Sequence, residues 1–130
     1  MLAPWIKDYI GLPWAENGDS RSGVSCYNLC RLVLREQFGI DAPDYRQRPV
    51  SRAFASALRD PAWREVATPE PGDLVLLRDN GLPAHCGLVV GDKRMLHVSE
   101  TTHSCIERYD GPIWANRVLG FYRPAARCAL

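Results

Sequence analysis

The stretch SGVSCYNLCRLVLREQF, residues 22–38, contains the clearest secondary-structure signal in the sequence. Apolar residues recur in it at the helical positions i, i+3, i+4 and i+7, through Cys26, Leu29, Cys30 and Val33. Ser25 is a residue type that caps helix N-termini, and Gly39 is typical of the position that ends a helix. The stretch therefore predicts a helix that packs on a core and holds Cys26 in its first turn.

The segments around this helix predict two more helices and then a series of strands. Residues 4–11 are compatible with a short helix stopped by Gly11 and Pro13, and residues 50–59 with another that ends before Pro61. Beyond residue 60 the period changes to that of strands, which we expect in PGDLVLL (71–77), HCGLVVG (85–91), RMLHVS (94–99), HSCIERY (103–109) and RVLGFYR (117–123). Helices followed by hairpin-connected strands predict an α+β domain with its helices on one face of an antiparallel sheet.

Length and composition favour a globular protein. The chain has 130 residues, 46% of them hydrophobic and 24% charged, which is compatible with one domain over residues 1–130. The formal net charge is +1 and the basic residues are scattered, so we expect no nucleic-acid partner. No apolar run reaches the roughly 18 residues of a membrane span, and we expect no membrane insertion. The N-terminus lacks the features of a secretory signal, so export would need another route.

Five cysteines, an odd number at irregular spacings, argue against a disulfide-stapled scaffold. Neither a Cys-x-x-Cys nor a His-x-x-x-His pair occurs, so we expect no metal or other cofactor. Cys30 lies a full turn inside the predicted helix and is interpreted as a small buried hydrophobe.

Cys26 is the candidate nucleophile, because backbone N–H groups and the helix dipole favour a thiolate in a first turn. Its amide could also help to hold an oxyanion. A thiolate nucleophile needs an imidazole, for which His85 and His97 are the candidates. In a flat hairpin with a three-residue turn these two would be about four residues out of register, roughly 13 Å, so twist or a bulge must bring them together. From the residues alone, a structural role for either histidine stays open.

Six short segments together resemble a known family. In chain order they are YIGLPW (9–14), GVSCYNL (23–29), GIDAP (39–43), PGDLV (71–75), HCGLVVG (85–91) and MLH (95–97). They are similar, in the same order, to motifs of the NlpC-type cysteine peptidases, papain-like bacterial cell-wall endopeptidases. The resemblance extends from residue 9 to residue 123.

The resemblance implies roles for individual residues. It makes Cys26 the nucleophile, His85 the general base and then acid, and His97 the residue that orients His85. It implies a papain-like core, with N-terminal helices packed on a mostly antiparallel sheet of five to six strands. Cys86 stands at a small apolar position and is interpreted as packing, whereas His103 and Cys105 match no catalytic position.

Four positions depart from the family pattern. Trp14 replaces an aromatic that is usually Tyr and is thought to help the oxyanion, and its indole N–H is a substitute donor. Ser25, Tyr27 and Asn28 stand where the family usually has Asp, Ser and Gly. The resemblance implies that Trp14, Ser25 and Tyr27 contact the substrate or the oxyanion, and the departures leave the choice of substrate open.

The expected function is a cysteine endopeptidase that cleaves peptidoglycan stem peptides, at the γ-D-glutamyl-diaminopimelate bond on the family's precedent. Tyr27 and the segment GFYR (120–123) resemble the branch encoded by phage and prophage tail modules. That branch implies a location in the virion tail, or in the bacterial cytoplasm before assembly, and other tail-tip proteins as partners. A catalytically idle tail component, and an acyltransferase or amidase on the same fold, are the alternatives.

Overall fold

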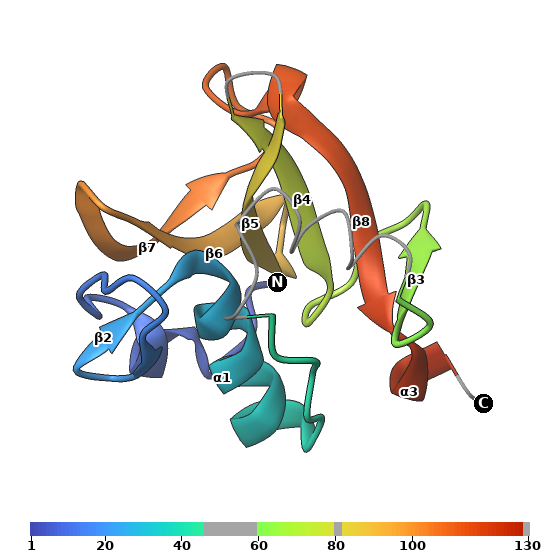
Figure 1. Ribbon diagram of the computed structural model, residues 1–130. Coiled ribbons are helices and arrows are strands. Elements are labelled where there is room, and N and C mark those ends of the chain that lie inside the picture. The colour runs from blue at the N-terminus through green and yellow to red at the C-terminus, as the bar shows by residue number, and fades with distance from the viewer. Residues whose placement is uncertain (46–59, 80–81, 129–130) are drawn as a thin grey trace.

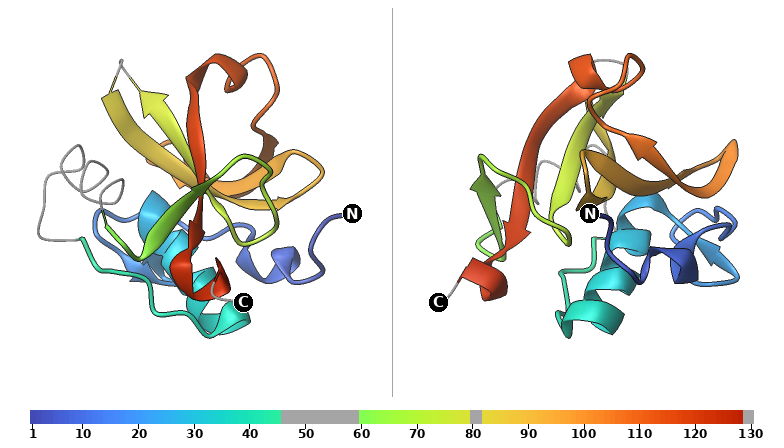
Figure 2. Two further views of the ribbon diagram at one scale, coloured as in Figure 1. Left: turned by 90° about the vertical axis from the view of Figure 1, so that its right-hand side faces the viewer. Right: turned by 180° about the vertical axis from the view of Figure 1, so that it is seen from behind.

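The computed structural model describes residues 1–45, 60–79 and 82–128, with the side chains of 82–84 left outside the description. Its main elements are the helix α1 (Cys26–Phe38) and a sheet in the order β3-β8-β4-β5-β6-β7, in which every pairing is antiparallel. Figure 1 shows α1 lying against the β5–β6 region of the curved sheet, and Figure 2 shows the same arrangement from two further sides. The predicted α+β class and antiparallel sheet are confirmed.

The six strands of this sheet are β3 (Trp63–Val66), β4 (Leu74–Asp79), β5 (Leu82–Gly91), β6 (Arg94–Ser99), β7 (Thr102–Arg108) and β8 (Val118–Pro124). The smaller elements are the 3-10 helices η1 (Ile6–Tyr9) and η2 (Ala115–Arg117), the short strands β1 (Asp19–Ser20) and β2 (Gly23–Val24), and the single-turn helix α3 (Ala125–Cys128). The five predicted strands are all present, whereas β3, β1 and β2 were not predicted. The predicted helix at residues 4–11 is only the single turn of η1, and the one predicted at 50–59 lies outside the described residues.

Helix α1 begins and ends where its sequence predicts. The Ser25 hydroxyl accepts a hydrogen bond from the Asn28 backbone N–H, and Gly39 ends the helix in the left-handed conformation with φ of 66°. The apolar stripe, which includes Leu29 and Leu34, is fully buried. Each buried leucine stabilises the fold by about 1.5–3 kcal/mol. These contacts fix the direction in which the first turn of α1, with Cys26, meets the sheet.

Alternating side chains cover the two faces of the sheet. One face packs on α1 and includes Leu74, Leu76, Cys86, Leu88, Val90 and Leu96. The opposite face includes Val75, Leu77, Val89 and Met95 together with Val118 and Phe121 of β8, and Tyr109 and Trp114 pack in the same cluster. Strand alternation therefore places the side chains of His85 and His97 on the second face, the one that Trp114 covers.

The β5–β6 hairpin determines how far apart the two histidines lie. Its turn has two residues, Asp92 and Lys93, with φ of 51° and 59°, and the pairing shifts by one residue between Val89 and Gly91. If the pairing of Leu88 with Leu96 is continued along the hairpin, the residue opposite His97 is at position 87. His85 therefore lies two positions away from the residue opposite His97. Such diagonal neighbours are about 7–8 Å apart. Of the two alternatives expected, twist or a bulge, the structure has a bulge, and its two-residue turn replaces the three-residue turn considered for a flat hairpin.

The segment PGDLV is joined to the last strand by a buried ion pair. Asp73 is fully buried and accepts hydrogen bonds from the Glu70 backbone N–H at 2.7 Å and from Arg123 at 2.9 and 2.8 Å. Arg127 adds a contact of 3.3 Å. The pair therefore ties the turn before β4 to the end of β8.

No helix among the described residues is long and apolar enough to cross a membrane.

Candidate active site

Cys26 is the first residue of α1, directly after the Ser25 cap, and it is partly exposed. Its pKa lies well below the ordinary value for a thiol. The largest cause is a hydrogen bond from the side chain of Cys86, and a hydrogen bond and charge interaction with His85 act in the same direction against the cost of burial. The sequence prediction that folding brings Cys26 close to His85 is therefore met by the structure.

Cys86 is the buried neighbour of this thiol. It is completely buried, and burial followed by the neighbouring sulfur of Cys26 raises its pKa well above the ordinary value. The two thiols thus differ, because the pKa of Cys26 is lowered and that of Cys86 is raised, so Cys86 is the one that keeps its proton and can donate it to the sulfur of Cys26. The packing role predicted for Cys86 is incomplete, since its thiol also contacts the candidate nucleophile.

A chain of hydrogen bonds runs from His85 into the sheet. His85 Nε2 lies 3.0 Å from His97 Nδ1, and His97 Nε2 lies 2.9 Å from Glu107 Oε1. His97 is 2% exposed, and burial together with the neighbouring His85 lowers its pKa. His97 is therefore neutral at pH 7, with one ring nitrogen as donor and the other as acceptor.

The carboxylate at the end of this chain decides the tautomers. Glu107 offers only acceptors, so His97 carries its proton on Nε2 and leaves the Nδ1 lone pair free to accept from His85. His85 then carries a proton on Nε2 and has Nδ1 left for Cys26. In this arrangement His85 can take the thiol proton, and the resulting imidazolium still donates to His97. The chain therefore suits a base that must accept and return a proton.

Trp114 covers the two histidines. Its ring stacks on His85 with centroids 5.4 Å apart at 21°, and it meets His97 edge-on at the same centroid distance. Its indole N–H donates to the second oxygen of Glu107 at 3.1 Å. The indole thus shields the His85–His97 hydrogen bond from water and holds the Glu107 carboxylate in place.

The three candidate substrate contacts, Trp14, Ser25 and Tyr27, differ in their surroundings. Trp14 forms a parallel bridge with Val24 and packs against the core below α1, and within the described residues its indole N–H has no hydrogen-bond partner. The Ser25 hydroxyl serves as the helix cap. The Tyr27 hydroxyl donates to the Pro43 carbonyl at 2.7 Å, so the structure uses both hydroxyls internally and leaves the Trp14 N–H available.

Three residues at the site were not predicted to belong there, namely Cys105, Glu107 and Trp114. Cys105 pairs directly with His97 across β6 and β7, and Glu107 follows two residues later on the same face of β7. The Cys105 sulfur lies 3.8 Å from His97 Nε2 and 4.0 Å from Glu107 Oε1. An alternating polar pattern at 103–107 was the available signal, but its partner strand is not visible in the sequence. His103 is exposed and takes no part in this arrangement.

Comparisons with known proteins identify the family of this chain. The profile of the NlpC/P60 family matches residues 11–123. A protein of Escherichia coli K12 named murein DD-endopeptidase MepS/murein LD-carboxypeptidase is 27% identical over 113 residues, which are 85% of this chain and 54% of that relative. The chain thus spans about half the length of that curated relative.

Two solved structures share the fold. An NlpC/P60 family protein from Bacillus cereus superposes with a TM-score of 0.68 at 21% identity, over 90% of this chain and 36% of the other. The NlpC/p60 domain of the peptidoglycan hydrolase SagA superposes with a TM-score of 0.58 at 22% identity, over 80% and 83%. Since the family profile covers most of its residues, this chain belongs to the NlpC/P60 family.

Proposed function

We propose that this protein is a cysteine peptidase that hydrolyses peptidoglycan stem peptides, with Cys26 as nucleophile, His85 as general base and acid, and His97 orienting His85. The observation that carries the proposal is the lowered pKa of Cys26 beside His85, whose other ring nitrogen is held by His97. Membership of the NlpC/P60 family and the murein activities in the name of the E. coli relative support the substrate class.

The proposed reaction begins when His85 Nδ1 takes the thiol proton of Cys26. The thiolate attacks the amide carbonyl, and the first-turn amide of Cys26 helps to hold the oxyanion, with the Trp14 indole N–H as a second donor. His85 returns the proton to the leaving amine. Water, deprotonated by His85, then hydrolyses the thioester and restores the thiol. Throughout, His97 keeps the His85 ring in the tautomer that faces the sulfur.

The bond that we propose is cleaved is γ-D-glutamyl-diaminopimelate, on the precedent of the motifs at Cys26 and His85. The E. coli relative is named for two other murein bonds, so the assay has to separate the products. Purified sacculi and defined muropeptides are incubated with the wild type, and the products are identified by liquid chromatography and mass spectrometry. We expect free N-terminal diaminopimelate peptides. Products of DD-cleavage alone would contradict this bond assignment.

Two variants test the nucleophile and the base. Cys26→Ser and His85→Ala are expected to abolish product formation, whereas Cys128→Ala, which removes a remote thiol on α3, is the matched control. Muropeptide release by Cys26→Ser at the rate of the wild type would refute the cysteine mechanism.

A catalytically idle domain is the second candidate, because Ser25, Tyr27 and Asn28 depart from the family pattern and their side chains serve internal hydrogen bonds. Thiol labelling separates the two at neutral pH. An active peptidase has one fast-reacting cysteine, Cys26, whereas an idle domain has none. An acyltransferase or amidase would instead reveal acyl adducts of a different substrate on Cys26 by mass spectrometry.

We further propose that the protein acts in a phage or prophage tail, where it opens the wall of the next cell during DNA delivery. The support is the aromatic Tyr27 directly after the nucleophile and the GFYR segment, whose Arg123 binds Asp73. Proteomic analysis of particles purified after prophage induction should detect the chain. Its presence only in the cell fraction would contradict the tail location.

A further inference from the structure

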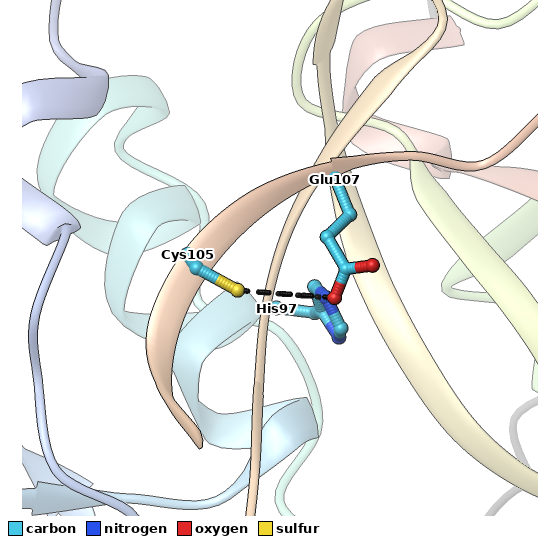
Figure 3. Close-up of side chains that lie close together, drawn as sticks. All are labelled: His97, Cys105 and Glu107. Carbon is cyan, nitrogen blue, oxygen red and sulfur yellow. Dashed lines mark hydrogen bonds and ion pairs between the residues drawn. The ribbon is translucent and has the colours of Figure 1, made fainter. Parts of the chain in front are cut away.

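A second set of ligand atoms surrounds the far side of His97. The Nε2 of His97, the sulfur of Cys105 and the Oε1 of Glu107 all lie within 4.8 Å of one another. Figure 3 shows the Cys105 and Glu107 side chains extending from β7 toward the His97 ring. Strand pairing places Cys105 opposite His97, and the two-residue period of β7 puts Glu107 on the same face.

The separations approach those of a tetrahedral zinc site. Zinc binds nitrogen, oxygen and sulfur at about 2.0–2.3 Å, which places pairs of ligand atoms roughly 3.3–3.6 Å apart. The distances here are 2.9 Å from His97 to Glu107, 3.8 Å from His97 to Cys105 and 4.0 Å from Cys105 to Glu107. Shifts of about half an ångström, within the reach of ordinary side-chain adjustment, would bring all three separations to the spacing of ligands around one tetrahedral ion.

The donor set and its surroundings also suit this ion. An imidazole nitrogen, a thiolate and a carboxylate together are preferred by zinc over magnesium or calcium, which take oxygen ligands. The Glu107 side chain is 36% exposed, so the ion has a route from solvent and a fourth position for water. The second ring nitrogen of His97, Nδ1, is hydrogen-bonded to His85. Histidines that bind a metal through one nitrogen usually make such a hydrogen bond with the other.

We propose that His97, Cys105 and Glu107 bind Zn²⁺, and that the bound ion reversibly switches off the peptidase. The inhibition rests on the proposed function, whereas the binding does not. Zinc takes the Nε2 lone pair of His97 in place of its proton, and the Cys105 thiol releases its proton to solvent. The remaining His97 proton must then lie on Nδ1, facing His85.

The switch follows from this change of tautomer. With a proton on Nδ1, His97 donates to His85 Nε2, so the single proton of neutral His85 moves to Nδ1 and faces Cys26. His85 then has no lone pair with which to accept the thiol proton. A doubly protonated His85 is also disfavoured, because two N–H groups would oppose each other across 3.0 Å. Zinc thus reverses the direction of the hydrogen-bond chain on which the general base depends.

Binding is measured first, in chains that lack the nucleophile, because Cys26 is itself a potential zinc ligand. Cys26→Ala is titrated with zinc against a chromophoric chelator, and we expect one tightly held ion per chain. When Cys105→Ala is added to Cys26→Ala, the affinity for zinc should fall by more than roughly 10- to 100-fold, which is the loss expected when a residue that only hydrogen-bonds to a metal ligand is removed. The double variant with Cys128→Ala is the matched control and should bind as Cys26→Ala does. Circular dichroism confirms that each variant is folded.

Inhibition is then measured as the ratio of muropeptide release with zinc to that with EDTA, for each variant separately. The wild type and Cys128→Ala should lose release reversibly, and Cys105→Ala should need a much higher zinc concentration for the same loss. Equal sensitivity of Cys105→Ala and the wild type, or no zinc binding by Cys26→Ala, would overturn the proposal. If Cys26→Ala binds zinc through Cys105 but the wild type cleaves nothing in EDTA, the zinc site stands and the proposed peptidase function fails.

Discussion

His85 Nε2 and His97 Nδ1 lie 3.0 Å apart although the two residues are two positions out of register in their hairpin. The bulge at Val90 and the two-residue turn produce this diagonal offset, and the long imidazole rings close the remaining distance. One inserted residue in β5 thus determines whether the proposed base and its proposed orienting partner can meet. A second hydrogen bond joins His97 to Glu107, so two further side chains hold the His85 ring.

Glu107 is expected to set the tautomer of His97 and so to affect turnover. Glu107→Ala should lower kcat on the order of tenfold, less than the 10²–10⁴-fold contribution of a general base itself, with KM nearly unchanged because Glu107 lies behind His97. Glu107→Gln keeps one acceptor but presents an NH₂ group to the Trp114 N–H, so its effect should be intermediate. The measurements are steady-state kinetics on a defined muropeptide and the alkylation rate of Cys26. A rise in KM without a fall in kcat would contradict the positioning role.

Trp114 should matter through both its ring and its N–H. Trp114→Phe preserves an aromatic face over His85 but loses the hydrogen bond to Glu107, whereas Trp114→Ala also exposes the His85–His97 bond to water. We expect kcat to be highest for the wild type, lower for Trp114→Phe and lowest for Trp114→Ala, with a difference on the order of tenfold between the two variants. Trp63→Phe is the control, because Trp63 packs near Tyr27 on the other side of the sheet. Equal rates for Trp114→Phe and Trp114→Ala would show that only the N–H contributes.

Cys86 should keep Cys26 ionised. Cys86→Ala removes the largest cause of the lowered Cys26 pKa, so the midpoint of the pH profile for alkylation of Cys26 should move to higher pH. The reaction at pH 6 should slow accordingly. Cys30→Ala is the matched control, since Cys30 is an equally buried thiol that donates to the Cys26 carbonyl rather than to its sulfur. A midpoint that stays in place or moves downward in Cys86→Ala would refute the role of the second thiol.

What the sequence predicts well is local in origin. The Ser25 cap, the apolar stripe of α1 and the Gly39 stop depend on residues within a few turns of each other, and all three were predicted with the correct bounds. The strands with strong alternation were also found. Strand β3 was missed because only two of its four residues are apolar, and its place in the sheet depends on pairing with β8, sixty residues away.

The parts of the site that were missed depend on strand register. Glu107 and Cys105 reach His97 only through the β6–β7 pairing, and Trp114 reaches His97 and Glu107 from the connection between β7 and β8. The contact between Cys26 and Cys86 likewise joins a helix terminus to a central strand. No local pattern encodes such contacts. The resemblance to the family identified Cys26, His85 and His97 as candidates from the order of its motifs. It could not identify residues that lie outside those motifs.

Arg123 is expected to stabilise the turn before β4. Arg123→Ala leaves the buried Asp73 carboxylate with the Glu70 backbone N–H and, as its only remaining cation, the more distant Arg127, and breaking a buried pair in this way costs about 3 kcal/mol. Arg127→Ala should cost much less, because the two-point bond from Arg123 remains. Urea denaturation followed by circular dichroism gives both values. A smaller loss for Arg123→Ala than for Arg127→Ala would contradict the assignment of the main partner.

The ion pair between Arg21 and Glu36 should make stability depend on pH in acid. The two terminal guanidinium nitrogens of Arg21 donate to Glu36 at 2.8 Å, and the Tyr9 hydroxyl donates to it at 2.7 Å. Together these bonds hold the segment before Cys26 against α1. These bonds lower the Glu36 pKa from 4.5 to about 2. Because the folded pKa lies below the unfolded one, the stabilisation is complete above about pH 4.5 and is lost as the pH falls through 2.

The size of this effect is limited by solvent, since the Arg21 and Glu36 side chains are 47% and 34% exposed. We expect Glu36→Gln to lower the free energy of unfolding by about 1 kcal/mol at pH 6, and the difference from the wild type to shrink at pH 3 and vanish near pH 2. Urea denaturation at the three pH values measures it, with the exposed Glu16→Gln as control. A difference that is the same at pH 6 and pH 2 would mean that the carboxylate charge of Glu36 does not stabilise the fold.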